Sequence, residues 1–240
     1  MGLGVGTLVA LLSGMLLTGD WGGLLLNVGA ELAGALATYG LLELVIRRRE
    51  ESEAKKADLI VQMGSQVQDV AIAAAEELKR HKWLYDGSLQ GANLRGANLQ
   101  EADLYGVNLQ EARLFVANLQ GADLANANLQ EASLGGANLQ EARLTSAHLQ
   151  GANLQGANLQ EADLDWANLQ EARLASAHLQ GAKLCRTRLR GASLAEANLQ
   201  GANFDVNTTL PDGTKWTPDT DIARFTDLEH PDFWRPEKLP

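Results

Sequence analysis

Two histidines occupy matching places in the sequence and are the residues best suited to chemistry. His148 lies in ANLQEARLTSAHLQGANL (137–154), and His178 lies in the near-copy ANLQEARLASAHLQGAKL (167–184). Imidazole is the commonest metal ligand in proteins and acts as a general base near neutral pH. Two such rings could hold a metal ion or share a proton, provided that the fold brings them together.

The single cysteine, Cys185, is the other candidate for reactivity. Lys183, Arg186 and Arg188 lie near it, and nearby cations can lower the pKa of a thiol. No histidine or acid is placed to orient it as a nucleophile, so we expect it to be unreactive. One cysteine cannot form an internal disulfide, so nothing requires an oxidising compartment.

All three residues lie in a repeat with a period of five. From Leu89 to Phe204 a large apolar residue recurs in 24 consecutive pentads. In an α-helix, each step of five would rotate that residue by about 140°, and no apolar face would form. In a strand, five is odd, so successive leucines would alternate between faces. If the chain instead turns a corner once per pentad, every leucine points to a common axis.

Glutamine indicates how many sides this coil has. It follows the central residue at 90, 100 and every tenth position to 180, then at 200, with Arg190 the only break. A four-sided coil of 20 residues keeps this period of ten in register, which gives six coils and a rod of about 29 Å at about 4.8 Å per coil. We expect the glutamines to form two ladders on opposite sides, with stacked amides hydrogen-bonded along them.

The alanine two places before each leucine is expected to point inward as well. Gly87, Val107 and Thr187 are the exceptions, and the coils that hold the two larger residues should bulge or adjust. Each buried leucine contributes about 1.5–3 kcal/mol before entropy is subtracted. Stacking between coils should therefore stabilise the rod.

This geometry separates the candidate catalytic residues. His148 and His178 are one and a half coils apart, so they fall on opposite sides and cannot share a metal or form a dyad. A filled solenoid also lacks the convergent polar pocket that an enzyme needs. We therefore predict no catalytic residue, no metal site and no cofactor.

The pentads ANLQG, ANLQE and ADLYG match the consensus Ala-(Asn/Asp)-Leu-x-x, so residues 87–206 resemble the pentapeptide repeat family. The resemblance implies a β-solenoid, a right-handed quadrilateral β-helix. The flanks are similar to those of bacterial membrane-anchored members, through MGSQVQDVAIAAAEELKRHKWLYDGSL before the repeats and TLPDGTKW after them.

The N-terminal region, 1–46, predicts a transmembrane helical hairpin. Residues 2–19 carry no charge, and a second apolar run over 22–46 is interrupted by Asn27, Glu31 and Glu43. Arginines at 47–49 place the following chain in the cytoplasm. A cleaved signal peptide is the alternative, although no basic residue precedes the first run. Small residues spaced by four in the second run could pack within the hairpin or form a homodimer.

The remaining segments are expected to cover the two ends of the rod. Residues 47–86 predict a charged juxtamembrane helix and a capping helix that begins at a capping box, Ser65 with Gln68. An apolar stripe on that helix should pack on the first coil: Val67, Ala71, Ala74, Ala75 and Leu78. The tail, 207–240, should cover the last coil; a partner-binding tail is the alternative.

The surface offers few groups to a partner. The formal charge is -10, and the repeats carry 8 Lys/Arg against 12 Asp/Glu, so direct binding of nucleic acid is not expected. Residues that stand out on the polar sides form the candidate interaction surface: Phe115, Trp166, Arg186, Arg188 and Arg190.

These features predict a non-enzymatic scaffold or protein-interaction module. Residues 2–46 would anchor it in the bilayer of the cell (inner) membrane, and the rod would meet an unidentified protein partner in the cytoplasm. The resemblance also implies an alternative, because the quinolone-resistance members of the family are understood as acidic rods that mimic DNA and bind DNA gyrase. Here the acidity is mild, and the last coils are basic.

Overall fold

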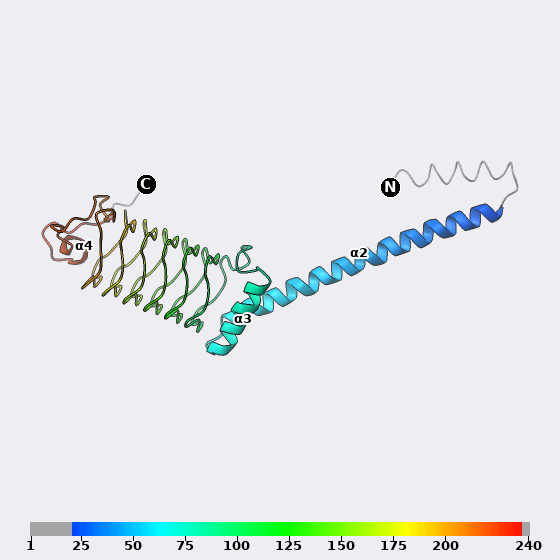
Figure 1. Cartoon of the computed structure of the whole chain (residues 1–240), viewed down its shortest axis with the longest axis horizontal. Helices are drawn as coiled ribbons and strands as arrows, with labels where there is room; N and C mark the ends of the chain where they lie inside the picture. The colour runs from blue at the N-terminus through cyan, green and yellow to red at the C-terminus, as the bar shows by residue number, and fades with distance from the viewer. Residues whose placement is uncertain (1–20, 237–240) are drawn as a thin grey trace. The chain divides into compact units, whose positions relative to one another are not determined.

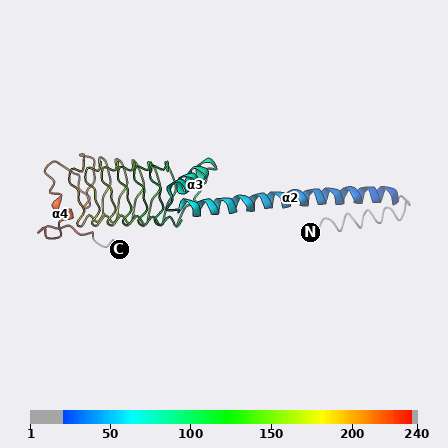
Figure 2. The same cartoon turned by 90° about the horizontal axis from the view of Figure 1, so that it is seen from below.

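The computed structural model describes residues 21–236 and divides the chain into two compact units, Met1–Lys55 and Lys56–Pro240. The described helices are α2 (Trp21–Met63), α3 (Gln68–Arg80) and α4 (Ala223–Thr226). Between α3 and α4 lies a stack of coils, which Figures 1 and 2 show as successive rungs.

The coils have the 20-residue length that the glutamine pattern predicted. Parallel bridges join each bridging residue to the one 20 positions later, as in Asn98 with Asn118. Each side of a coil contributes one bridging residue, so the described repeats hold isolated bridges in place of longer strands. We number the four sides by these residues: side 1 holds 93, 113, 133, 153, 173 and 193; side 2 holds 98 to 198; side 3 holds 103 to 203; side 4 holds 108 to 188 and then 209.

The corners of the coils come from one backbone conformation repeated every fifth residue. The second residue after each central residue has a positive φ at every corner from Gly91 to Gly201. Ten of these corners are glycine and thirteen carry a side chain, including Val116 and Trp166. A side chain in the left-handed region costs roughly 1–2 kcal/mol. The stack therefore imposes this conformation against local preference at more than half of its corners.

The interior of the stack is filled by the predicted columns. The central leucines from Leu89 to Leu189 and the alanines from Ala97 to Ala192 have little or no exposed surface. Thr187 is also buried, and its hydroxyl donates to the carbonyl of Leu164 at 2.8 Å. This hydrogen bond satisfies the polar group that Thr187 brings into the apolar interior. The coil beyond it is one residue longer, since Arg188 pairs with Thr209.

The predicted glutamine ladders are wrong, because asparagine takes that role among the described residues. Asn118 donates its amide to Asn98 at 3.1 Å, and Asn138 and Asn158 continue the ladder at 3.2 Å per step. The same asparagine oxygens accept the backbone N–H two residues later, as Asn118 does from Gln120. Asparagine is the bridging residue before the leucine on the flat side, whereas glutamine lies at the corner.

Helix α3 covers the first coil as expected, with Ala71, Ala74, Ala75 and Leu78 buried. The predicted capping box is wrong, because the N-cap is Val67. Val67 was also wrongly placed in the packed stripe, since it is 59% exposed. Ser65 Oγ accepts the Val67 N–H, and its carbonyl accepts the Asn98 N–H at 2.8 Å. The Gln68 side chain donates to the Gln100 carbonyl. These groups serve the open edge of the first coil, which requires hydrogen-bond partners more than the helix end does.

The tail packs against the last coil. Trp216 stacks on Phe204 with ring centroids 6.0 Å apart, and Phe225 is buried against Trp234. The Glu196 N–H donates to the Thr226 carbonyl at 2.7 Å, which extends the hydrogen bonding of the coil edge into α4. These contacts agree with a covering role.

The predicted transmembrane hairpin is not seen in the described part of the chain. No helix over 21–236 combines the length and apolar character needed to cross a membrane. Asn27, Glu31 and Glu43 interrupt the apolar run within α2, and the first predicted span, 2–19, lies outside the described residues.

Replacing Gly156 with alanine tests the corner conformation without a steric clash. Gly156 has φ +64, and a Cβ there would meet nothing within 4 Å. We expect Gly156→Ala to lower the free energy of unfolding by about 1 kcal/mol in urea titrations, because only backbone strain is added. Gln155→Ala, at the exposed neighbouring position, should change it by less than about 0.5 kcal/mol. Equal effects would contradict the corner argument.

His178 interrupts the asparagine ladder of side 2, between Asn158 and Asn198. The oxygen Oε1 of the following Gln180 is buried without a partner. Asparagine at 178 would restore an acceptor and a donor at the spacing of the ladder. We expect His178→Asn to raise the free energy of unfolding by about 1 kcal/mol, and Asn158→His to lower it. A stabilised Asn158→His protein would refute the ladder as a source of stability.

Candidate interaction surface

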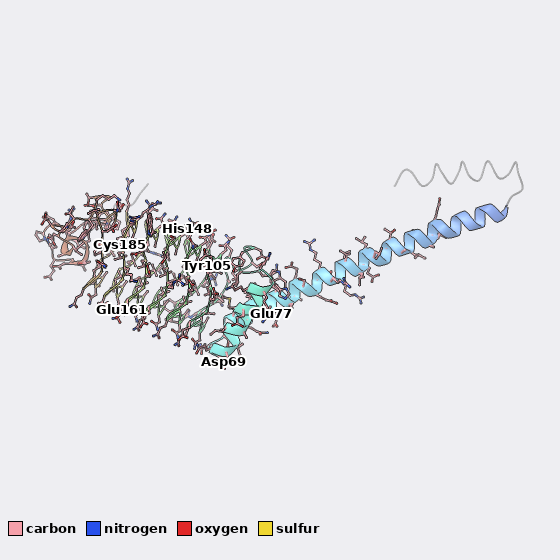
Figure 3. All side chains as sticks on the ribbon, viewed as in Figure 1. Asp69, Glu77, Tyr105, His148, Glu161 and Cys185 are labelled. Atoms are coloured by element: carbon pink, nitrogen blue, oxygen red, sulfur yellow. The ribbon has the colours of Figure 1, made fainter. Side chains whose placement is uncertain are left out.

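The histidines lie as far apart as the sequence predicted. His148 bridges Asn128 and Asn168 on side 4, whereas His178 lies on side 2. No group of three or more His, Cys, Asp or Glu residues that could hold a metal occurs in the described part of the chain. Figure 3 shows Tyr105 and Cys185 along one edge of the stack and Glu161 along another.

The cations near Cys185 in the sequence do not activate its thiol, because the pKa of the thiol is raised. Burial raises the pKa of its thiol, and the carboxylates of Asp165 and Asp205 raise it further, while Arg186 acts in the opposite direction. Asp165 Oδ1 accepts the Cys185 N–H at 2.9 Å, so an acid lies closer to the cysteine than its sequence neighbours suggest. Stacking brings residues 20 positions away beside the thiol, and here those residues are acidic.

Side 3 carries a row of ionisable groups that are paired with one another. Arg143 contacts Asp123 at 2.7 Å, and Lys183 contacts Asp163 at 3.6 Å. At the start of the row, Lys79 from α3 donates to Asp103. This hydrogen bond lowers the pKa of Asp103. The acids are thus paired with cations of side 3 or of α3, and no uninterrupted acidic strip results.

The candidate residues do not form one patch. Phe115 lies at the corner that follows side 1, and Trp166 lies at the corner that follows side 3, two sides away. Trp166 is 56% exposed and has the Arg186 guanidinium over its ring, 4.2 Å from the centroid. Arg188 lies on side 4, and Arg190 lies at the corner that follows it. The structure therefore joins Trp166 to Arg186 and places Phe115 elsewhere.

The Phe115 ring contacts the residues one coil away on either side of it, Arg95 and Gly135. Arg95 is 4.9 Å from its ring centroid, and its edge is so close to Gly135 that a Cβ there would be 3.2 Å from Phe115 Cδ2. The ring is still 41% exposed. The sequence analysis did not single out the arginines beside Phe115. A signal was present, because Arg95 and Phe115 occupy the same variable position after leucine and are 20 residues apart.

Asp205, 19 residues after Arg186, contacts both its backbone and its side chain. The carboxylate accepts the Arg186 N–H at 2.7 Å, and its other oxygen is 3.7 Å from Arg186 Nε. Burial by itself would raise the pKa of Asp205, but hydrogen bonds from the Asn207 side chain, the Arg186 N–H and the Thr208 hydroxyl outweigh it and lower the pKa to about 2. Asp205 thus fixes the position of the Trp166–Arg186 pair.

Because the folded-state pKa of Asp205 is depressed, its contribution to stability is present above about pH 4 and is lost as the pH falls through about 2. We expect Asp205→Asn to destabilise the chain by about 1–3 kcal/mol at pH 7 and to flatten the fall in stability between pH 4 and pH 2. The control is Asp219→Asn at an exposed position. Urea unfolding across pH measures both, and an unchanged acid limb in Asp205→Asn would disprove this role.

Comparison with solved structures returns β-helical repeat proteins. HetL from the cyanobacterium Nostoc sp. strain PCC 7120, a protein involved in heterocyst differentiation regulation, is 36% identical over 53% of this chain and 61% of its own, with a TM-score of 0.33. Rfr23 from the cyanobacterium Cyanothece 51142 is 43% identical over 43% of this chain and 64% of its own, with a TM-score of 0.27. Trypsin-treated QnrB1, a plasmid-mediated fluoroquinolone resistance protein, is 22% identical over 55% of this chain and 74% of its own, with a TM-score of 0.37.

The chain spans less than two thirds of the length of HetL and of Rfr23. A search of curated proteins gave no match. The family model for pentapeptide repeats matches in 8 copies over residues 84–114, 117–156, 137–175 and 172–205, which together make up half of the chain. Proteins with these repeats are right-handed β-helix solenoids, as the family resemblance implied. On the strength of these matched repeats and the 20-residue coils that they form, the chain belongs to the pentapeptide repeat family.

Proposed function

We propose that the protein is a non-enzymatic interaction module that presents its β-helix to a protein partner as a rigid polar rod. The filled interior carries this proposal, because the central leucines and alanines leave no space between the coils for a substrate. Backbone groups of the flat sides are hydrogen-bonded to adjacent coils, so only side chains are available to a partner. Exposed aromatic residues are typical anchors of such contacts, and Phe115 and Trp166 are both available.

We further propose that residues 2–46 attach the rod to the inner membrane, with the repeats in the cytoplasm. The uncharged run over 2–19 and the arginines at 47–49 support this arrangement. Within α2, large apolar side chains between them are exposed in the described structure: Leu32, Leu36, Tyr39, Leu41, Leu42, Leu44, Val45 and Ile46. A lipid surface or a second copy of the helix would remove them from water.

Gyrase-directed DNA mimicry is the alternative that the family resemblance brings. It needs an extended acidic surface in place of the phosphates. The pairing of Asp123 with Arg143 and of Asp163 with Lys183 argues against such a surface on side 3. Inhibition of supercoiling by micromolar protein would favour this alternative over a membrane-attached scaffold.

Deleting residues 2–46 tests attachment. We expect the full chain to sediment with membranes after a high-salt wash, because apolar burial is insensitive to salt, and the deleted chain to remain in the supernatant. Quantitative blotting of both fractions measures the difference. Replacing the arginines at 47–49 with glutamine controls for purely electrostatic attachment. Equal sedimentation of the full and deleted chains would exclude these residues as the anchor.

Proximity labelling from the repeat domain in its native membrane tests the interaction role. The wild-type rod should label a small, reproducible set of proteins, and Phe115→Ala or Trp166→Ala should reduce that labelling at least about tenfold if the anchor is central. An enzyme fused to the N-terminal region alone provides the background. Identical labelling by rod and background would refute the module.

A further inference from the structure

Side 1 differs from the other sides in its charge. Together with the corner that follows it, side 1 presents three exposed arginines, Arg95, Arg113 and Arg173, and none of them forms an ion pair with a described carboxylate. On side 3, by contrast, the cations Arg143 and Lys183 are each matched to an aspartate one coil away. The charge of side 1 is therefore available to a molecule from outside, although the chain as a whole is acidic.

Two of these arginines frame a shallow groove of about 500 Å³. Phe115 forms part of its wall, with Arg95 against one face of the ring and Gly135 beneath its edge. The absence of a side chain at Gly135 lets the ring lie along the rod, so apolar surface and guanidinium groups are presented together. The lining is completed by neutral polar groups: Asn93 and Ser133.

We propose that this groove binds an acidic segment of a partner protein. A glutamate or aspartate of the segment pairs with Arg113 and Arg95, whose planar guanidinium groups suit a carboxylate. An adjacent aliphatic or aromatic side chain packs on Phe115, while Asn93 and Ser133 hydrogen-bond the backbone of the segment. This inference rests on the proposed interaction function and gives it a face and a partner chemistry.

The charges around the groove favour a protein segment over a nucleic acid. Glu111, Glu131 and Glu171 stand at the corner that leads into side 1, so a continuous polyanion lying along the rod would meet them. Phosphate binding gains affinity by neutralising many phosphates at once. A segment with one or two carboxylates beside an apolar residue fits the groove without reaching that acidic edge.

The test uses the full chain in detergent and a short fluorescein-labelled peptide in which glutamate alternates with leucine and phenylalanine. Anisotropy should show saturable binding, and a peptide with glutamine in place of glutamate should bind at least about tenfold more weakly. Arg113→Glu should weaken binding of the acidic peptide by about tenfold or more, and Phe115→Ala should weaken it by a similar factor. Arg173→Glu is the matched control, because it makes the same charge change on the same side, two coils beyond the groove residue Ser133.

Several results would overturn the proposal. One is the absence of binding up to about 1 mM acidic peptide, and another is equal affinity for the glutamine peptide. A third is an equal loss of affinity in Arg173→Glu and Arg113→Glu, and the last is tighter binding of single-stranded DNA of matched charge than of the acidic peptide. Circular dichroism confirms that each variant is folded. If the Arg113→Glu rod labels the same proteins as the wild-type rod, the groove is not the binding site, while the interaction function stands. If the wild-type rod labels nothing above background, the interaction function itself is wrong.

Discussion

The architecture follows from a corner at every fifth residue. At each corner, the second residue after the central residue adopts the left-handed conformation. Neither a helix nor a strand collects leucines spaced by five, whereas four such corners return the chain to its starting point after 20 residues. Thirteen corners adopt the conformation without glycine. The energy that opposes it there is offset by burial of the leucine and alanine columns and by hydrogen bonds from coil to coil.

The same geometry makes every surface position the neighbour of the residue 20 positions away. Columns of like residues become ladders, as for the asparagines of side 2, and columns of mixed charge become ion pairs, as for Asp123 and Arg143. Chemical character is thereby segregated by side. Side 2 is a column of amides interrupted by His178, and side 3 is a row of paired charges. Side 1 is lined by arginines and leads to an aromatic ring at its corner. Such a rod is suited to recognition by one face and offers no enclosed site for catalysis.

The two ends of the stack show how a solenoid is terminated. At the first coil, the Ser65 carbonyl and the Gln68 side chain bind backbone groups of the coil, and α3 covers its apolar surface. At the last coil, Asp205 gathers N–H and hydroxyl donors, and Trp216 stacks on Phe204. In both places, side chains and backbone groups of the flanking segments supply the hydrogen bonds that a further coil would have made. The Trp166–Arg186 pair depends on the same residue, since Asp205 also contacts the Arg186 side chain.

The sequence was sufficient to predict the period, the four sides, the leucine and alanine core and the separation of His148 from His178, because these follow from spacing alone. It also indicated that α3 and the tail would cover the ends. Other features depended on which atoms come within bonding distance once the coils stack. Asparagine, not glutamine, forms the ladder because it lies on the flat side. Ser65 and Gln68 bond to the edge of the first coil and do not form a capping box. The pKa of the Cys185 thiol is raised by burial and by Asp165 and Asp205, against the opposite effect of Arg186. The groove beside Phe115 likewise needs Arg95, Arg113 and Gly135, which are 18 to 40 residues apart in the chain and adjacent only in the folded stack.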